Sequence, residues 1–476
     1  MTNNSRRRFI NRIVGGSLGM SAFPSLAFAG RKDRSYAVQL KNLPVIDEVD
    51  ICVLGGSCTG VFAAIRASRL RAKVAIIEKQ NAFGGVATHA LVNIWHSIYD
   101  AEFKQQIIAG LTTETMERLA RRNAVVKTSN NHSKAFTFNS QELKIELDEM
   151  VLESNIHPYL HTLFSEPFFD EDKRLTGIIV DNKSGRGIIK AKYFIDATGD
   201  GDLCQRLGLD TYAHDLIQPP TTCAHFEGLN IEKVNNLLKE HREEFNIPDG
   251  FLWGSDLPGT NTFMMAGTRV YGVNCSVADD LTRAEMEGRR QIRAIMDMVR
   301  KYAPQEQPGL VALPSSIGIR ETRHVRCRYQ VTDHDALDGK RFEDAIANGS
   351  YRLDIHHQDK PGLTFMYLDG TQVYSRPGYP NVTSRWREDA GENTGFYQVP
   401  LRSLIPPKYN NLMIAGRMLD AQMIAFSGIR VMVNMNQLGE AAGVTSSLAL
   451  HKNKAIHEVD SKDVRNELKK GGSIIV

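Results

Sequence analysis

The 476-residue sequence has few cysteines, and none of them is placed as a redox or metal-binding pair would be. Its six cysteines form no C-x-x-C motif and no closely spaced set with histidine: Cys52, Cys58, Cys204, Cys223, Cys275 and Cys327. This excludes a redox dithiol and a structural zinc site of the usual spacing, and we predict no bound metal. Disulfide bonds stay possible, although a chain of this length does not need them to build a core.

The sequence also lacks an internal repeat, a low-complexity tract and an excess of charge of one sign. It has 58 basic and 55 acidic side chains, a formal net charge of +3. Residues 1–29 hold four arginines and no acid, so the remainder carries 54 basic against 55 acidic groups. Nothing therefore indicates a nucleic-acid partner. A hydrophobic content of 42% is ordinary for a soluble globular chain of two or three compact units.

The N-terminal region has no apolar run strong enough to span a membrane comfortably, because the run over residues 13–28 contains three glycines and Pro24. The run follows Arg6-Arg7-Arg8 and closes with Ala27-Phe28-Ala29. A basic region, an apolar region and a small-residue site are typical of a twin-arginine export signal, here cleaved after Ala29. We predict a signal peptide over 1–29, the twin-arginine export machinery as a partner, a periplasmic or otherwise exported location and no stable membrane span after cleavage. A basic tail or a membrane anchor is the alternative.

The most informative stretch that is present covers residues 49–79. An apolar strand, 51–54, is followed by a Gly-rich turn, a helix with a small-residue face and a second strand that ends at Glu78, 18 residues after Gly60. This is the pattern of a dinucleotide-binding βαβ unit, in which a pyrophosphate lies on the free N–H groups of the helix and the acid binds a ribose hydroxyl. The predicted cofactor-binding residues here are Gly55, Gly56, Ser57, Cys58, Thr59, Gly60, Glu78 and Lys79.

The turn departs from the usual G-x-G-x-x-G at its middle glycine, which is Ser57 here. Serine is a mild replacement, since its side chain is small and its hydroxyl can donate a hydrogen bond to a phosphate. Taken alone, the unit is compatible with NAD, with FAD or with a strand-turn-helix that binds nothing.

Downstream patterns give a coarse map of the chain. Helices are expected over 103–120, 141–154, 231–245 and 281–303, an antiparallel meander over about 156–192, a last buried strand over 411–417 and a closing helix from about Gly428 to Leu450. No second Gly-rich turn between a strand and a helix, with a downstream acid, follows residue 100. A separate NAD(P)H-binding domain is therefore not predicted, and electrons would come from the substrate or from a partner.

Five motifs in order resemble the FAD-dependent oxidoreductases of the glutathione-reductase-like fold, a widespread bacterial family that is often exported. These motifs are the βαβ unit with Glu78, Gly84-Gly85, residues 196–201 (DATGDG), residues 318–323 (GIRETR), and residues 415–417 (AGR) with 427–432 (SGIRVM). The resemblance covers nearly the whole chain after residue 29. It implies an α/β fold, a Rossmann-like FAD-binding domain of glutathione-reductase type with an inserted α+β substrate domain. The implied boundaries are 1–29 signal peptide, 46–210 first part of the FAD-binding domain, 211–400 substrate domain, 401–452 closing strand and helix, and 453–476 C-terminal tail.

The resemblance also assigns cofactor contacts beyond the βαβ unit. It implies that FAD is held by Gly84, Gly85, Thr198, Gly199, Asp200, Gly416 and Arg417. The closing helix would point its N-terminus, with Ser427, Gly428 and Ile429, at the flavin, where N–H donors and a partial positive charge stabilise the negative charge of the reduced ring. His89 and His96 follow the Gly84-Gly85 turn, and a covalent flavin link through either stays open.

The resemblance also suggests catalytic residues. Histidine is a suitable base for a hydroxyl proton while hydride goes to flavin N5, and His356 lies in a segment that the family shares. Arg320 is the candidate anchor for an anionic or polyhydroxylated substrate, and Arg430 the candidate neighbour of flavin or substrate. Structural roles, such as a surface charge cluster for Arg320 or a salt bridge for Arg430, stay open for each. We expect a dehydrogenase of a small polar compound, with oxygen or an external electron acceptor. A partner-fed reductase or monooxygenase, or a flavin-binding protein that is not an enzyme, is the alternative.

Overall fold

The computed structural model describes residues 43–376, 379–388 and 395–476. The predicted signal peptide over 1–29 lies outside these residues. The fold described below is that of residues 44–476. Within the described residues, no helix combines the length and the apolar character needed to cross a membrane.

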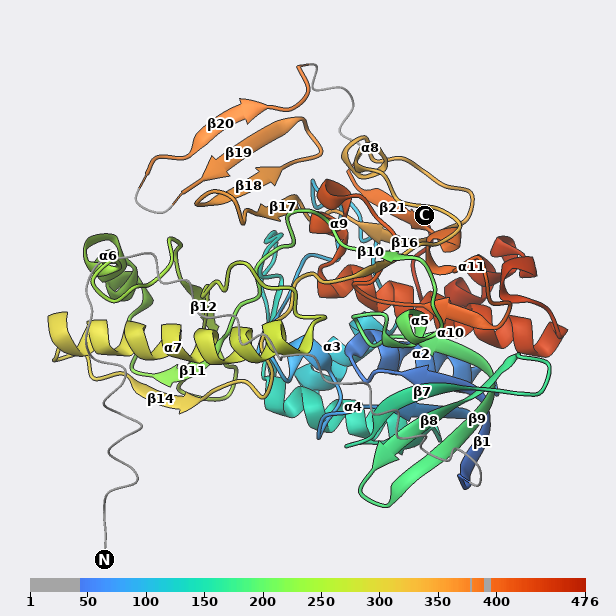
Figure 1. Cartoon of the computed structure of the whole chain (residues 1–476). Coiled ribbons are helices and arrows are strands. Elements are labelled where there is room, and N and C mark those ends of the chain that lie inside the picture. The colour runs from blue at the N-terminus through green and yellow to red at the C-terminus, as the bar shows by residue number, and fades with distance from the viewer. Residues whose placement is uncertain (1–42, 377–378, 389–394) are drawn as a thin grey trace, which may run out of the picture. The chain divides into compact units, whose positions relative to one another are not determined.

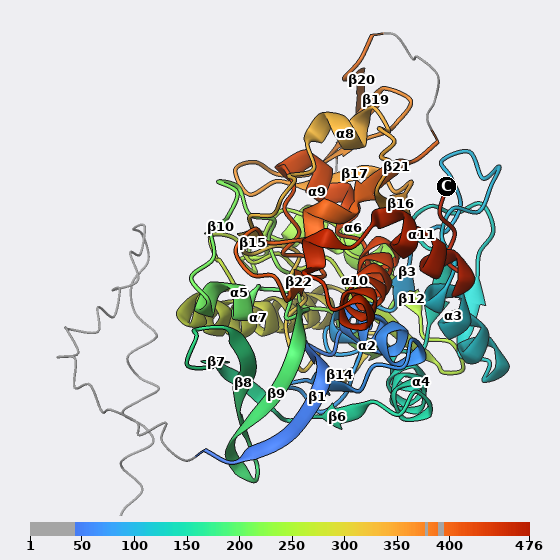
Figure 2. The ribbon, with the colours of Figure 1, turned by 90° about the vertical axis from the view of Figure 1, so that its right-hand side faces the viewer.

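The centre of the fold is a sheet that the first βαβ unit begins (Figures 1 and 2). Its strand order is β6 (His157–Tyr159), β2 (Val74–Ile77), β1 (Val45–Leu54), β9 (Gly185–Asp196), β8 (Leu175–Asn182) and β7 (Leu163–Phe169), and β22 (Leu412–Ile414) also pairs with β9. Parallel pairing joins β6 to β2, β2 to β1, β1 to β9 and β9 to β22. Antiparallel pairing joins β9 to β8 and β8 to β7. The carboxyl ends of β1, β9 and β22 therefore lie at one edge, where ligands bind in open α/β sheets.

Helices that are distant in sequence cover this sheet together. The helix α2 (Cys58–Arg69) lies directly against α10 (Met432–Lys452), as both views show. A Cβ added to Gly439 would lie 2.0 Å from the Thr59 carbonyl oxygen, and one added to Gly443 would lie 2.1 Å from that of Ala63. Glycine at these positions lets the two backbones touch, because any side chain would push the helices apart. Around them lie α3 (Leu111–Arg121), α4 (Ser140–Glu153), η3 (Ile456–Glu458) and α11 (Ser461–Lys470).

The central part of the chain forms smaller sheets. The first has the order β12 (Trp253–Asp256), β13 (Thr262–Ala266), β11 (Ala224–Glu227) and β14 (Gly309–Ala312). Its core is shared with α6 (Ile231–His241) and the long helix α7 (Ala278–Tyr302), which runs beside it in Figure 1. The second has the order β17 (Leu353–His356), β18 (Leu363–Met366), β19 (Thr371–Ser375) and β20 (Val382–Arg385).

Short elements link these layers. They are η1 (Gly85–Ala87), β3 (Ile94–Trp95), β4 (Val125–Lys127), β5 (Phe136–Phe138), α5 (Asp202–Arg206), β10 (Thr211–Tyr212), β15 (His324–Val325), α8 (Asp333–Leu337), β16 (Ala345–Gly349), β21 (Tyr397–Pro400), η2 (Leu401–Leu404) and α9 (Met423–Ile429). All six cysteines are free thiols.

Four sequence-based boundaries are corrected by the structure. The helix expected over 103–120 begins only at Leu111, after Phe103 and Gly110 adopt positive φ values that a helix excludes. The helix expected over 231–245 ends at His241. Residues 157–159 belong to a strand parallel to β2, so the meander contains only β7, β8 and β9. The closing helix starts at Met432, because residues 423–429 form the separate helix α9.

Candidate functional site

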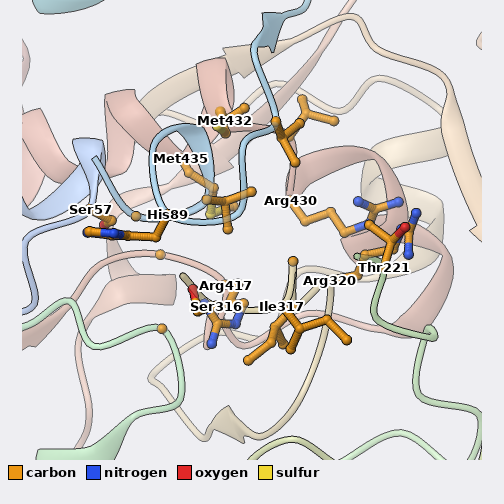
Figure 3. A pocket seen from close by; sticks show the side chains of 18 of the residues that line it. Ser57, His89, Thr221, Ser316, Ile317, Arg320, Arg417, Arg430, Met432 and Met435 are labelled. Atoms are coloured by element: carbon orange, nitrogen blue, oxygen red, sulfur yellow. The ribbon is translucent and has the colours of Figure 1, made fainter. Parts of the chain in front are cut away.

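A cavity of about 760 Å³ opens at the carboxyl edge of the main sheet and extends toward the central sheets. Sixteen of the residues predicted from the sequence line it: Gly55, Ser57, Cys58, Thr59, Glu78, Lys79, Gly84, Gly85, Thr198, Gly199, Asp200, Arg320, His356, Gly416, Arg417 and Arg430. Figure 3 shows that their side chains enter from several segments of the chain. The tertiary fold thus gathers into one cavity residues that lie up to 375 positions apart.

The turn after β1 is shaped for close approach of a ligand to the backbone. Gly55 has φ +100°, and a Cβ there would lie 2.4 Å from the Ala197 carbonyl oxygen at the end of β9. Ser57 is the N-cap of α2, and its Oγ accepts a hydrogen bond from the Gly60 N–H at 3.4 Å. The Ser57 hydroxyl proton stays available to donate toward the cavity. Gly56 and Gly60 do not line the cavity; a Cβ at Gly60 would lie 1.9 Å from the Gly55 carbonyl oxygen, so this glycine sets the helix against the turn.

Glu78 lies at the end of β2 and is held in place by the backbone. Its two carboxylate oxygens accept hydrogen bonds from the N–H groups of Gly56 at 2.7 Å and Gln80 at 2.8 Å. The side chain is buried, yet it lines the cavity. Each oxygen retains a lone pair, so the oriented carboxylate can accept from two neighbouring hydroxyls of a ribose.

The ends of β9 and β22 meet through an ion pair. Arg417 Nη2 donates to Asp200 Oδ1 at 2.5 Å, and Asp200 also accepts from the Thr322 hydroxyl. Burial raises the pKa of Asp200, but the Arg417 guanidinium and the Thr322 hydrogen bond more than offset it, and the pKa is lowered overall. Arg417 therefore faces the cavity with a fixed orientation, while its Nε has no hydrogen-bond partner among the described residues.

The closing helix contacts the cavity with different residues from those predicted. Ser427, Gly428 and Ile429 lie inside α9, are buried and do not line the cavity. A Cβ at Gly428 would lie 2.4 Å from Leu353, so this glycine serves packing against β17. The N-cap of α10 is Val431, and the lining residues from this helix are Met432, Met435 and Asn436. The break at Arg430 moves the free N–H groups of the helix by about one turn from the predicted position.

His356 ends β17 and forms a buried pair with Asp354. Its Nε2 lies 3.2 Å from Asp354 Oδ2, and its Nδ1 has no hydrogen-bond partner among the described residues. Burial lowers the pKa of His356 to about 3; Asp354 opposes this shift, and Arg320 and Arg430 add to it. The imidazole is therefore neutral near pH 7. Because a carboxylate only accepts, Nε2 carries the proton and Nδ1 presents a lone pair.

Arginines gather around this pair, including two that the sequence patterns did not indicate. Arg320 donates to the Pro219 carbonyl oxygen, and Arg430 lies 3.6 Å from Asp354 Oδ2. Arg269, which precedes α7, and Arg352, next to β17, line the same cavity. No motif marks Arg269 or Arg352, and the two come together with Arg320 only through the packing of the central sheets.

His214, Glu321 and His324 form a second cluster, outside the cavity lining. Both histidines place a ring nitrogen near Glu321 Oε1, at 2.5 Å and 3.3 Å. Burial raises the pKa of Glu321, but these hydrogen bonds outweigh it and lower the pKa to about 2. Three potential metal ligands thus lie within 4.8 Å of one another, an arrangement that spacing in the sequence did not reveal.

The residues at the sheet edge fit a flavin dinucleotide. The glycine cradle at Gly55, the N-terminus of α2, the oriented Glu78 carboxylate and Arg417 supply the donors and acceptors that a pyrophosphate and a ribose need. The second helix terminus, at Val431, adds N–H donors to the same cavity. Fold and site together define a dinucleotide-dependent α/β enzyme.

The sequence model of one family, described as FAD dependent oxidoreductase, matches residues 50–468. The chain therefore belongs to this family: it is an FAD-dependent oxidoreductase, and FAD is its cofactor. No protein with a curated description matches the chain.

The chain is also similar, at low sequence identity, to several solved structures. A geranylgeranyl bacteriochlorophyll reductase-like protein from Thermoplasma acidophilum is 11% identical over 89% of this chain and 83% of its own, with a TM-score of 0.45. A p-nitrophenol 4-monooxygenase from Pseudomonas putida is 10% identical over 89% and 84%, with a TM-score of 0.39. A flavin-dependent brominase is 10% identical over 89% and 84%, with a TM-score of 0.42.

Substituting Glu78 by alanine is expected to weaken FAD binding. The change removes a charged acceptor from the ribose site and leaves the Gly56 and Gln80 N–H groups without their hydrogen-bond acceptor. The expected loss of binding free energy is about 1.5–3 kcal/mol, which raises the Kd for FAD about 10- to 100-fold. Titration of the FAD-free protein with FAD measures this. Glu78→Gln keeps the shape of the side chain and one acceptor oxygen, so its Kd for FAD should lie between those of the wild type and Glu78→Ala. A Kd unchanged in Glu78→Ala would show that the ribose does not contact this side chain.

Proposed function

We propose that the protein is a dehydrogenase that removes a hydride from a hydroxyl-bearing carbon of a small polar substrate. The bound FAD supplies the hydride acceptor. The observation that carries the proposal is the Asp354–His356 pair in the wall of the cavity, with an unpartnered Nδ1 lone pair on a neutral imidazole. No motif for a nicotinamide domain follows residue 100, which supports an external electron acceptor or oxygen for reoxidation.

His356 has the properties of a general base. The hydroxyl proton of the substrate would pass to Nδ1, while Asp354 holds the Nε2 proton and stabilises the imidazolium that forms. Asp354 is itself fixed, because the Tyr351 hydroxyl donates to it at 3.3 Å and Arg430 lies beside it. Although burial raises the pKa of Asp354, His356 and the arginines lower it overall, so this group is an anion when the base acts.

Anaerobic mixing of the purified protein with a panel of sugars and hydroxy acids tests the proposal. A dehydrogenase loses its visible flavin absorbance with substrate alone, without any protein partner. A reductase or monooxygenase would be bleached only by an electron-donating partner, and photoreduction followed by acceptor screening would identify it. Absence of bleaching throughout the panel, together with reduction by a partner, would overturn the dehydrogenase assignment.

The rate of flavin reduction is expected to be nearly independent of pH between about pH 5 and 8. Free histidine titrates in this window, but burial lowers the pKa of His356 to about 3, so the base is deprotonated throughout. Stopped-flow reduction with a substrate that does not ionise in this range measures the profile. If the rate of flavin reduction fell tenfold per pH unit below a midpoint near pH 6.5, this would contradict the buried environment assigned to His356.

We also propose the finer features of fold and location. The antiparallel β7–β8–β9 meander followed by return of β22 to β9 supports the glutathione-reductase subclass, with the segment 211–400 as a substrate domain and 453–476 as a C-terminal tail. The Arg6-Arg7-Arg8 pattern supports export through the twin-arginine machinery. Cell fractionation of the full chain and of an Arg7→Lys/Arg8→Lys variant tests export: the variant should accumulate in the cytoplasm.

A further inference from the structure

The end of the cavity around His356 carries an excess of positive charge. The guanidinium groups of Arg269, Arg320, Arg352 and Arg430 line it, and one of them, Arg430, lies 3.6 Å from the Asp354 carboxylate. The other acidic lining residues have partners elsewhere: backbone amides for Glu78, Arg417 for Asp200 and Arg289 for Glu285. Burial and the neighbouring Arg430 and Arg269 lower the pKa of Arg320 to about 9. Arg320 donates to the Pro219 carbonyl oxygen and the Val270 N–H donates to that of Pro220, so Arg269 and Arg320 flank one short segment.

These guanidiniums are also short of hydrogen bonds. Each of the four makes one hydrogen bond within the described residues: to Gly267 O, Pro219 O, Ser133 Oγ and Asp354 O. A guanidinium offers five N–H donors, and a buried charge without partners costs several kcal/mol. Arg269 is only 5% exposed and makes no ion pair within the described part of the chain. The cluster therefore has N–H donors left with which it can bind an anion.

The pyrophosphate of FAD does not account for this charge. Its donors are the turn after β1, the N-terminus of α2 and Arg417. In Figure 3, Arg320, Arg430 and Thr221 lie together on the side of the cavity away from Ser57. Arg430 instead lies 3.6 Å from Asp354 Oδ2, the same oxygen that His356 Nε2 contacts, and Figure 3 shows Arg320 on the same side of the cavity as Arg430.

We propose that the substrate is a hydroxycarboxylic acid whose carboxylate is bound by Arg269 and Arg320 beside His356. The inference rests on the proposed function. A planar guanidinium can bind a carboxylate through two parallel hydrogen bonds. Because these arginines lie near the base, the bound carboxylate would lie close to the carbon that reacts. His356 Nδ1 would take the hydroxyl proton, and the bound FAD would supply the acceptor for the hydride of the carbinol carbon. The substrate thereby loses two electrons and two hydrogens and becomes an oxo acid.

Equilibrium binding to the FAD-loaded protein tests the anion site without turnover. We expect malonate to change the visible flavin spectrum in a saturable manner, and malonamide, its neutral analogue, to have no effect at the same concentration. Arg269→Gln and Arg320→Gln should each raise the Kd for malonate about 10- to 100-fold. Arg300 lies on the exposed face of α7, so Arg300→Gln is the matched control and should leave the Kd for malonate unchanged.

Each outcome separates the inference from the function on which it rests. Malonate binding that needs both arginines, without bleaching by any hydroxy acid, would retain the carboxylate site and reject the dehydrogenase. Bleaching by neutral alcohols, with no malonate binding, would retain the dehydrogenase and reject the carboxylate. An unchanged Kd in both arginine variants, with full FAD content, would also overturn the inference, and so would tighter binding of inorganic phosphate than of any carboxylate.

Discussion

Replacing His356 with alanine is expected to slow reduction of the flavin by substrate about 10²- to 10⁴-fold, while FAD content stays unchanged. The substitution removes the lone pair that would take the hydroxyl proton, and it leaves the residues of the nucleotide turn untouched. Single-turnover stopped-flow reduction under anaerobic conditions measures the step without the later reoxidation.

Two further variants make this result specific. His357→Ala changes the adjacent histidine, whose Nε2 lies 2.8 Å from the Thr364 hydroxyl and which does not line the cavity, so its rate should match that of the wild type. Asp354→Asn should slow reduction too, because an amide no longer fixes the Nε2 proton of His356. If His356→Ala and His357→Ala reduce the flavin at equal rates, His356 is not the base.

Replacing Glu440 with glutamine is expected to destabilise the protein by about 3–5 kcal/mol, because it leaves the Arg66 charge buried without its counter-ion. Both side chains are almost fully buried, and Glu440 also accepts from the Leu111 N–H and the Ser473 hydroxyl. The pair joins α2 to α10, whose N-termini both reach the cofactor cavity. Denaturant unfolding of the FAD-loaded protein, followed by circular dichroism, measures the loss.

An exposed ion pair and a double variant serve as controls. Glu114→Gln removes the partner of Arg69, the other arginine in the last turn of α2, and should cost less than about 1 kcal/mol because both side chains are solvated. Arg66→Met combined with Glu440→Leu should be more stable than Glu440→Gln, since no buried charge is left unpaired. If Glu114→Gln and Glu440→Gln lowered the free energy of unfolding equally, burial would not decide how much an ion pair contributes to stability.

The cofactor half of the site could be predicted from local sequence because its chemistry is local. Gly55, Ser57 and Glu78 belong to one continuous βαβ unit, in which the strand, turn and helix fix the backbone that meets the nucleotide. The order of the later motifs, up to Arg417, then favoured FAD over NAD, and the family match agrees with that choice of cofactor. Element boundaries were harder to predict: the closing helix expected from about Gly428 is divided into α9 and α10, and Gly428 lies inside α9, where it packs against Leu353 of β17.

The substrate half of the cavity is decided by tertiary structure. Arg269 and Arg352 carry no motif of their own, and the packing of the central sheets brings them into one cavity with Arg320 and His356, which the sequence patterns did indicate. The protonation state of His356 likewise depends on burial and on charges contributed by other segments. The sequence alone determined the class of cofactor: the backbone geometry of one short βαβ unit encodes a dinucleotide site, and the order of the later motifs favours FAD. Only the folded chain determined the charge around the base, because electrostatic interactions act between residues that are distant in sequence and adjacent in space.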